Sequence, residues 1–161
     1  MRSRHSGFTM IELMVVVGII SILSLMMLPS YLDKFTRDQI TEALPLADIA
    51  KAPISIAWSM MQSFPADNAA AGLPSADKIV SNYVSSVSIS SGAINITFGN
   101  LANGAIKGKI LTLRPAVVAD APIVPVAWVC GGAPTPNKMT AHGNNITNIP
   151  AAYLPFICRQ Q

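Results

Sequence analysis

Residues Met1–Leu28 read MRSRHSGFTMIELMVVVGIISILSLMML, and this stretch decides how the rest of the chain is organised. A short basic head ends at Gly7, and from Phe8 to Leu28 the only ionisable side chain is Glu12. A helix needs about 20 predominantly apolar residues to cross a bilayer. The run after Gly7 is therefore long enough to span a membrane, and the feature that needs an explanation is the acid inside it.

The carboxylate of Glu12 needs a positively charged partner if it lies in an apolar environment. A carboxylate within an apolar helix costs about 2.5–3.5 kcal/mol on insertion scales, and such a residue is by default a candidate functional site. No Lys or Arg occurs between Phe8 and Leu28. A positive group beside Glu12 would exist only as the α-amine of Phe8, which requires that the chain be cut after Gly7.

Two other interpretations of this start remain open at this point. A secretory signal peptide also has a basic head and an apolar core, but its core is about 7–15 residues long and is followed by the cleavage site. Here the apolar run is longer and the plausible cut precedes it. An uncleaved membrane anchor with an incidental glutamate is the second alternative.

The segment Gly7–Leu13, GFTMIEL, resembles the processing motif of type IV prepilins, and the short leader that ends in glycine before phenylalanine resembles the IVa subclass. The resemblance implies that a membrane peptidase cuts after Gly7 and methylates the new amino-terminal residue, Phe8. It also implies that Glu12 faces the Phe8 amine of a neighbouring subunit, while the apolar helices of many copies stack into a filament core.

The composition supports one domain of ordinary size in addition to the apolar segment, because 161 residues are enough to bury a core. The formal net charge is +3, and it falls to +1 if a leader containing Arg2 and Arg4 is removed. Charged residues make up only 12% of the chain. This balance is not the electrostatic footprint of a nucleic-acid-binding protein.

The two cysteines, Cys130 and Cys158, both lie in the last third of the chain. That part would lie outside the cytoplasmic membrane if the basic head stays inside, and in an oxidising compartment such a pair most simply forms one disulfide. Two free thiols are the alternative. A structural zinc site usually has four ligands, which two cysteines with only His5 and His142 do not supply, so no metal is expected.

No catalytic constellation can be built from the sequence. His142 stands among Ala, Gly and Asn residues and is expected to be a solvated loop residue. No phosphate-binding, zinc-binding helix or calcium-loop signature occurs. We therefore expect no enzymatic activity and no cofactor.

Helical periodicity continues beyond the apolar run to about Met61. Apolar residues recur at three- and four-residue steps and form an amphipathic stripe of the kind that packs against a sheet. The residues of this stripe are Ile40, Ala43, Leu44, Ala47, Ala50, Ile54, Trp58 and Met61. Proline removes a backbone hydrogen bond and clashes with the preceding turn, so kinks or melted turns are expected at Pro29, Pro45 and Pro53.

Four antiparallel strands are predicted after a loop at 62–77 that is rich in Pro, Gly, Ala and Asn. Alternating segments on either side of the Ser-Gly pair at 91–92 indicate a hairpin. Lys109–Arg114 is predicted as a third strand that ends before Pro115, and Val124–Cys130 as a fourth. We expect the sheet to have one polar face and to lay the other on the amphipathic half of the helix.

From Cys130 to Cys158 the sequence shows little periodicity, and an irregular stretch of this length is uncommon in a compact domain unless it is functional or tied down. A disulfide that closes it would add about 2–4 kcal/mol of stability. Tyr153, Leu154 and Phe156 are expected to form an apolar staple that holds this flap on the sheet.

The predicted fold class is α+β, with a long N-terminal helix whose apolar half protrudes and whose amphipathic half packs on a four-stranded antiparallel sheet, followed by a disulfide-closed C-terminal loop region. The predicted segments are a cleaved leader at 1–7, an apolar transmembrane and filament-core helix at 8–28, an amphipathic continuation at 29–61 and a globular head at 62–161. Within the head we expect a helix-to-sheet loop at 62–77, a sheet at 78–130 and the disulfide-closed region at 130–158.

Two basic neighbourhoods with nearby aromatic residues are weak candidates for DNA contact, which some type IV pilins make. The first contains Lys107, Lys109 and Arg114, and the second contains Lys138 and Arg159. Sparse charges of this kind are ordinary surface in most proteins, and the electrostatic footprint is weak.

The resemblance implies a structural subunit of a type IV pilus, which is a single-pass protein of the inner membrane before it joins an extracellular filament. Its implied partners are other copies of the chain, the prepilin peptidase and methylase, the assembly platform and minor pilins. Motility, adhesion and DNA uptake all use such filaments. The alternatives are a minor pilin, a DNA-binding competence pilin and a pseudopilin of a type II secretion system.

Overall fold

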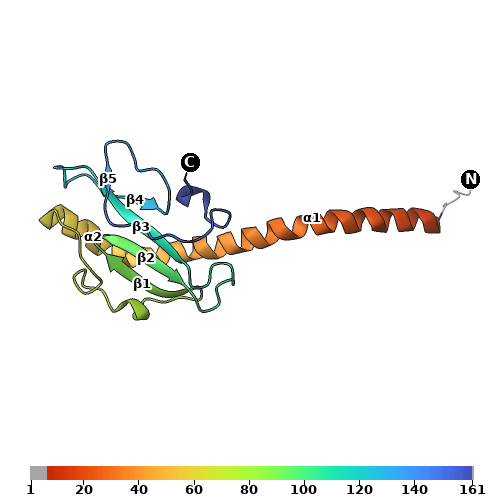
Figure 1. Ribbon diagram of the computed structural model, residues 1–161, viewed down its shortest axis with the longest axis horizontal. Coiled ribbons are helices and arrows are strands. Elements are labelled where there is room, and N and C mark those ends of the chain that lie inside the picture. The colour runs from red at the N-terminus through yellow and green to blue at the C-terminus, as the bar shows by residue number, and fades with distance from the viewer. Residues whose placement is uncertain (1–6, 161) are drawn as a thin grey trace, which may run out of the picture. The chain divides into compact units, whose positions relative to one another are not determined.

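The computed structural model describes residues 7–160, with only the backbone described at 28–30. Of the predicted leader, residues 1–6 lie outside this range. The chain divides into two compact units, Met1–Phe35 and Thr36–Gln161. Helix α1, Met10–Ala43, contributes its long first part to the first unit and its last turns to the second, which also holds helix α2 and every strand that Figure 1 labels.

The part of α1 in the first unit exposes its apolar side chains. Its most apolar 18-residue window has a mean hydropathy of 2.6 and no buried residue, so by length and composition this helix could cross a membrane. The hydroxyl groups of Ser21 and Ser24 donate hydrogen bonds of 2.7 and 2.8 Å to the carbonyl oxygens of Val17 and Ile20. The helix therefore satisfies these two polar side chains internally, as an apolar environment requires.

The prolines interrupt the helix at one position only. At Pro45 the α-helix gives way to a 3-10 turn, Leu44–Ala47, before α2 begins at Asp48. The expected interruption is therefore present at Pro45, where the tighter turn accommodates the missing N–H. Helix α1 continues through Pro29 and helix α2 continues through Pro53.

The predicted antiparallel sheet is confirmed (Figure 1). Its four main strands are β1, Val84–Ser90, β2, Ala93–Phe98, β3, Ile110–Val117, and β4, Ala127–Cys130. They are hydrogen-bonded in that order, and every pairing is antiparallel. A short strand β5, Thr140–Ala141, also pairs with β3. The hairpin between β1 and β2 turns at Ser91 and Gly92, which both have positive φ as a tight two-residue turn demands.

Two predicted strand limits were wrong. Strand β3 does not stop before Pro115 but continues to Val117. Pairing with β2 ends at Leu113. Beyond it, Pro115 lies opposite Trp128 of β4, and its carbonyl oxygen accepts the N–H of His142, so the strand continues although Pro115 has no N–H to donate. Strand β4 begins at Ala127 rather than Val124, after Pro125, which has no N–H to donate to a ladder.

The expected polar sheet face is present on the two central strands, but it is covered by other parts of the chain. Thr112 and Asn95 point away from the apolar core yet are 0% and 4% exposed, and the Thr112 hydroxyl donates to Asn95 Oδ1 at 2.8 Å. The segment 146–148 lies along this face, where the N–H of Ile146 donates to Thr112 Oγ1 and the N–H of Thr112 donates to Thr147 Oγ1. The C-terminal region thus covers a sheet face that the alternation of residues along the strands had predicted to be exposed to solvent.

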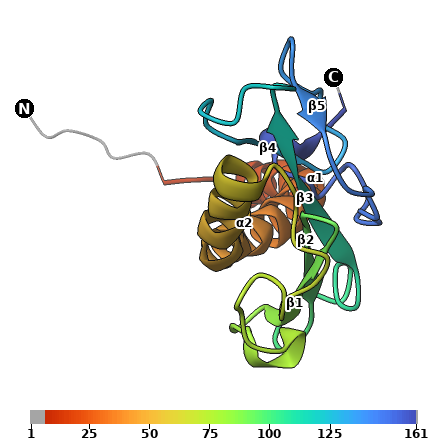
Figure 2. The ribbon, with the colours of Figure 1, turned by 90° about the vertical axis from the view of Figure 1, so that its left-hand side faces the viewer.

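The core lies between the helices of the second unit and the sheet. Figure 2 shows α2 lying against one face of the strands. Ile40 of α1 and Ile54 of α2 are fully buried, and they belong to one apolar cluster with Ile96 and Phe98 of β2 and Leu111 of β3. The amphipathic stripe predicted from the sequence therefore faces the sheet, except at its last member, Met61, whose side chain is 68% exposed. Burial of the stripe is the main favourable term for folding the head.

Strand β1 has its outer edge covered by the loop that follows α2. The buried side chain of Asn68 donates from Nδ2 to the carbonyl oxygen of Val87 and accepts the N–H of Ile89 at Oδ1. The N–H of Ser91 donates to the carbonyl oxygen of Ala66. A side-chain amide has two N–H donors and an acceptor oxygen, so Asn68 satisfies the strand edge as backbone groups would and donates its second N–H to the carbonyl oxygen of Pro74.

The disulfide between Cys130 and Cys158 is confirmed, and it closes the C-terminal region. Leu154 is 5% exposed and lies in the core cluster, and Tyr153 packs against that cluster. Phe156 was expected to be the third member of the staple, but its side chain is 70% exposed. The 3-10 turn Phe156–Cys158 turns the cysteine inward, and Phe156 lies outside the core.

Candidate functional site

Glu12 closes a reciprocal hydrogen-bonded cap at the start of α1. The helix begins at Met10, and Thr9 occupies the position before it. The N–H of Thr9 donates to Glu12 Oε2 at 3.4 Å, and the N–H of Glu12 donates to Thr9 Oγ1 at 3.3 Å. This is a capping box. Thr9 was not among the predicted site residues, although the Thr-x-x-Glu spacing before an apolar run is the signal that finds it.

The cap changes how the carboxylate of Glu12 should be understood. In the first turn of a helix an anion is favoured by the unpaired N–H groups and by the helix dipole. Glu12 therefore has a local role that needs no cation. The described chain brings no cationic side chain to Glu12, because its salt bridges join Lys51 to Asp48 and Lys78 to Asp77.

Gly7 and Phe8 lie in the irregular segment immediately before the cap. The side chain of Phe8 is 81% exposed. A Cβ added at Gly7 would meet no atom within 4 Å. Packing within the described chain therefore does not require glycine at position 7, and a requirement for glycine there would have to come from another molecule.

Arg37 and Arg159 clamp one peptide of the C-terminal region. Arg37 donates from Nε and Nη2 to the carbonyl oxygen of Ala152 at 3.1 and 2.8 Å. Arg159 donates from Nε to the carbonyl oxygen of Leu154 at 2.9 Å, and from Nη2 to that of Ala152 at 3.4 Å. Arg159 is a predicted candidate for DNA contact, and its guanidinium here binds backbone carbonyl groups of the C-terminal region. Arg37 joins that region to helix α1.

We expect Arg37→Ala to lower the free energy of unfolding by about 1–2 kcal/mol, because hydrogen bonds from charged donors are lost and the site is partly exposed. Chemical denaturation of the detergent-solubilised full chain, followed by tryptophan fluorescence, measures this change. Arg37→Lys keeps the positive charge but not the two parallel N–H donors, and we expect its free energy of unfolding to lie between those of the unaltered chain and Arg37→Ala. An Arg37→Ala protein as stable as the unaltered chain would contradict the clamp.

The residues proposed for DNA contact are not brought together by any hydrogen bond or ion pair within residues 7–160. Lys107 is exposed and its ammonium group donates to the carbonyl oxygen of Asn100 at 3.2 Å. Lys109 and Arg114 are half-buried, and Arg114 Nε is covered without a partner in this part of the chain. DNA contact through Lys107, Lys109 and Arg114 stays a prediction.

His142 is not the solvated loop residue that the sequence suggested. Its ring lies 5.0 Å from the ring of Phe64 and 6.1 Å from that of Trp58, centre to centre. Trp58 and Phe64 are themselves stacked at 5.1 Å. Strand β5 carries the neighbouring Ala141 and brings His142 to this cluster, which is a long-range effect that sequence spacing does not report. Among the described residues, no group of three or more His, Cys, Asp or Glu side chains could hold a metal ion.

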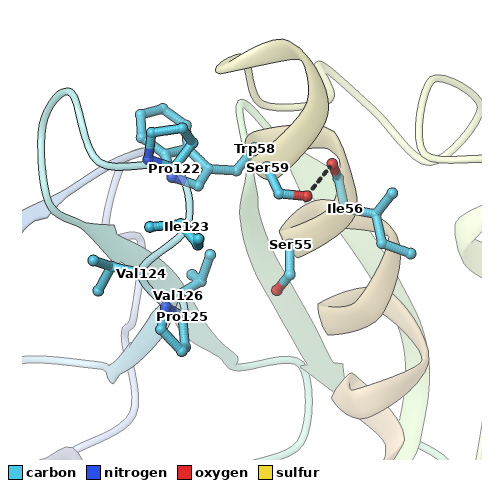
Figure 3. Close-up of a pocket in the computed structure, with 9 residues that line it drawn as sticks. All are labelled: Ser55, Ile56, Trp58, Ser59, Pro122, Ile123, Val124, Pro125 and Val126. Carbon is cyan, nitrogen blue, oxygen red and sulfur yellow. Dashed lines mark hydrogen bonds between the residues drawn. The ribbon is translucent and has the colours of Figure 1, made fainter.

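A shallow apolar groove of about 250 Å³ lies between α2 and the loop before β4 (Figure 3). Its α2 wall is formed by Ser55, Ile56, Trp58 and Ser59, and its other wall by 122–126. No charged side chain lines it. The groove lacks the convergent polar groups that a small-molecule site needs to orient a ligand.

Both units of the chain match known protein families. Residues 36–159 match the family model for pilin, a bacterial filament protein, and residues 2–28 match the prokaryotic N-terminal methylation motif. The chain is 33% identical to a fimbrial protein of Neisseria meningitidis serogroup B, and the match covers 99% of this chain and 96% of that protein. It is 34% identical to the type IV major pilin protein PilE of Neisseria gonorrhoeae, with the same shares covered. It is 36% identical to the fimbrial protein EcpC of Eikenella corrodens over 96% of this chain and 91% of that protein.

These matches extend over the apolar helix, the sheet and the disulfide-closed region, so they concern the whole molecule rather than its first segment alone. The chain belongs to the pilin family of bacterial filament proteins.

Proposed function

We propose that the chain is the major subunit of a type IV pilus, that it is cut between Gly7 and Phe8, and that the new amino group of Phe8 is methylated. The observation that carries this proposal is the continuous match to the N-terminal methylation motif over 2–28, next to an apolar helix that buries none of its most apolar window. Relatives of similar length carry the name major pilin, which favours a major subunit over a minor pilin or a pseudopilin.

The apolar helix has two successive environments in this proposal. Before assembly it holds the subunit in the inner membrane, with the head outside, because the basic leader stays inside. On assembly it exchanges lipid for the apolar helices of other copies, so the burial of apolar surface is nearly conserved and close packing is gained. The peptidase, the assembly platform and minor pilins would be its partners in these steps.

Glu12 is proposed to register each copy against its neighbour. Cleavage after Gly7 creates an amino group at Phe8, and in an apolar core an unpaired carboxylate is costly whereas a paired one is favoured. The capping box holds the Glu12 carboxylate at the amino end of its own helix. That end is where the amino terminus of an adjoining copy would have to arrive for a charge pair to form.

Substitutions at Glu12 and Thr9 separate pairing from capping. Glu12→Gln keeps a capping-box side chain but cannot form an ion pair. We expect it to reduce surface filaments at least tenfold, because a loss of about 1.4 kcal/mol per contact between copies corresponds to a factor of ten. Thr9→Val removes the reciprocal hydroxyl but keeps the carboxylate, and we expect it to leave filaments within about twofold, since a cap is worth about 1 kcal/mol within one helix.

Electron microscopy and the amount of chain in sheared filaments measure the outcome, with membrane-inserted chain as the reference. Normal filaments in Glu12→Gln would remove the pairing role. Loss of filaments in Thr9→Val alone would mean that the cap, and not the charge pair, carries the effect.

The major-subunit assignment has its own test. Deletion of the gene is expected to remove surface filaments, and sheared filaments of the unaltered strain are expected to consist mainly of this chain cut at Phe8. A strain that keeps abundant filaments after the deletion would contradict the assignment.

A further inference from the structure

Helix α2, Asp48–Met61, is apolar on two separate faces. Ala50 and Ile54 are buried beneath the sheet, whereas Ile49, Ile56 and Met60 are exposed by 50%, 54% and 80%. Steps of seven and four residues place these three on one stripe of the helix. No charged residue occurs from residue 52 to residue 61. The outer face of a solvated helix is usually charged or polar, so this stripe is suited to contact with another apolar surface.

The groove described above lies beside this stripe. Ile56 lines the groove, although in Figure 3 its side chain points away from residues 122–126, and across the groove Ile123 is 93% exposed. Figure 3 shows residues 122–126 on one side of the hollow and Ser55 and Ser59 on the other. The hydroxyl of Ser59 donates to the carbonyl oxygen of Ile56 at 2.9 Å and no charged side chain lines the groove, although Trp58 Nε1 on this wall is covered without a hydrogen-bond partner in the described part of the chain. The groove therefore favours an uncharged, apolar occupant.

The same head carries an apolar projection. Phe156 and Ile157 are exposed by 70% and 66%, and they are consecutive residues of a 3-10 turn. The next residue, Cys158, is fully buried and disulfide-bonded to Cys130. Arg159 holds the carbonyl oxygen of Leu154 on the other side of the turn. Covalent and hydrogen-bonded anchors on both sides hold the turn in place, so docking it would sacrifice little conformational entropy.

The groove and the Phe156–Ile157 turn lie at different ends of the second unit. In Figure 1 helix α2 is at the left of this unit and the dark-blue C-terminal turn is at its right, and in Figure 2, which views the molecule from that left side, α2 is in front. A contact between two unlike patches of identical copies is heterologous, and it can repeat from copy to copy without closing. This is the type of contact that extends a filament.

The size of the groove limits what can occupy it. An aromatic side chain buries on the order of 150–250 Å², whereas a stable interface between free proteins needs above about 1,000 Å². An independent partner would not be held by the groove alone. A second copy that is already tethered through its apolar helix has a high effective concentration, and for it a small contact is sufficient.

We propose that the groove of each head receives the Phe156–Ile157 turn of another copy in the filament. This inference rests on the proposed function as a filament subunit and adds a head-to-head contact to the helix core. Both surfaces are apolar and carry no charge, so opposite charges placed on the two sides would oppose assembly singly and pair when combined.

The test uses full-length chains in cells. Ser59→Lys places a charge in the groove and Ile157→Glu places one on the turn. We expect each to lower sheared filaments at least about tenfold, a loss of 1.4 kcal/mol or more per contact, and the double variant to recover to within about threefold of the unaltered chain. Leu101→Lys and Leu101→Glu, at a side chain that is 76% exposed outside both surfaces, serve as matched controls and should assemble normally.

The level of chain and its disulfide, followed on a non-reducing gel, report folding for every variant. The proposal is overturned if both single variants assemble normally, if the double variant assembles no better than the worse single variant, or if the Leu101 variants fail to the same extent. Should the unaltered chain form no filaments at all, the proposed function fails first, and this inference fails with it. The contact is supported if both single variants lose filaments and the double variant recovers them.

Discussion

Gly7→Val is expected to leave the chain uncut and to abolish surface filaments. The scissile peptide would carry a branched side chain at a position where the motif has none, and without cleavage no amino group forms at Phe8 to neutralise Glu12. The subunit itself should be indifferent to the change, because a Cβ at Gly7 meets no atom within 4 Å. A mass measurement on the membrane fraction should therefore find the full-length chain, longer by the seven-residue leader.

Gly18 provides the matched control for this experiment. It also has no atom within 4 Å of an added Cβ, and it lies within α1. Gly18→Ala should be processed normally, since alanine is the better helix former and leaves the cleavage site unchanged. Efficient cutting of Gly7→Val, with normal filaments, would contradict the cleavage assignment and with it the origin of the cation.

Replacing both Cys130 and Cys158 by serine is expected to cost about 3.5 kcal/mol of stability, the chain-entropy value for a closed loop of this length. The two residues are 28 positions apart, and both are buried. The region between them holds one two-residue strand and a 3-10 turn at its end, so it depends on the covalent link more than a longer regular element would. Denaturation of the solubilised full chain should show the loss as a lower midpoint.

Reduction with dithiothreitol supplies the control. It should destabilise the unaltered chain by a comparable amount and leave the double serine variant unchanged. An unaltered midpoint in the double variant, or two titratable thiols in the native protein, would argue against a stabilising disulfide.

Local patterns predicted much of this molecule. The apolar run predicted the long helix, and the Ser-Gly pair at 91–92 predicted the hairpin. The three- and four-residue steps predicted the buried helical stripe that contains Ile40 and Ile54. Each of these depends on contacts within a few residues or on a periodicity that a single element imposes. The capping box of Thr9 and Glu12 is equally local, and its spacing could have predicted it.

Long-range packing accounts for what the sequence did not predict. Strand β5 exists because β3 extends beyond Pro115 and offers a partner, and neither segment shows strand periodicity by itself. Thr112 looks like a solvated strand residue until segment 146–148 covers it. Phe156 was expected inside because it is aromatic and near Cys158, but its direction is set by the 3-10 turn, which spacing does not reveal.

The carboxamide of Asn68 has a consequence for a protein that must exist at very high local density. An uncovered strand margin is a template on which like chains polymerise into cross-β aggregates. Here the backbone groups of Val87 and Ile89 that would nucleate such growth are already occupied by an amide from the same chain. Closely packed heads therefore cannot extend their sheets into one another by backbone hydrogen bonds at this edge. Assembly of the filament then depends on contacts between side chains.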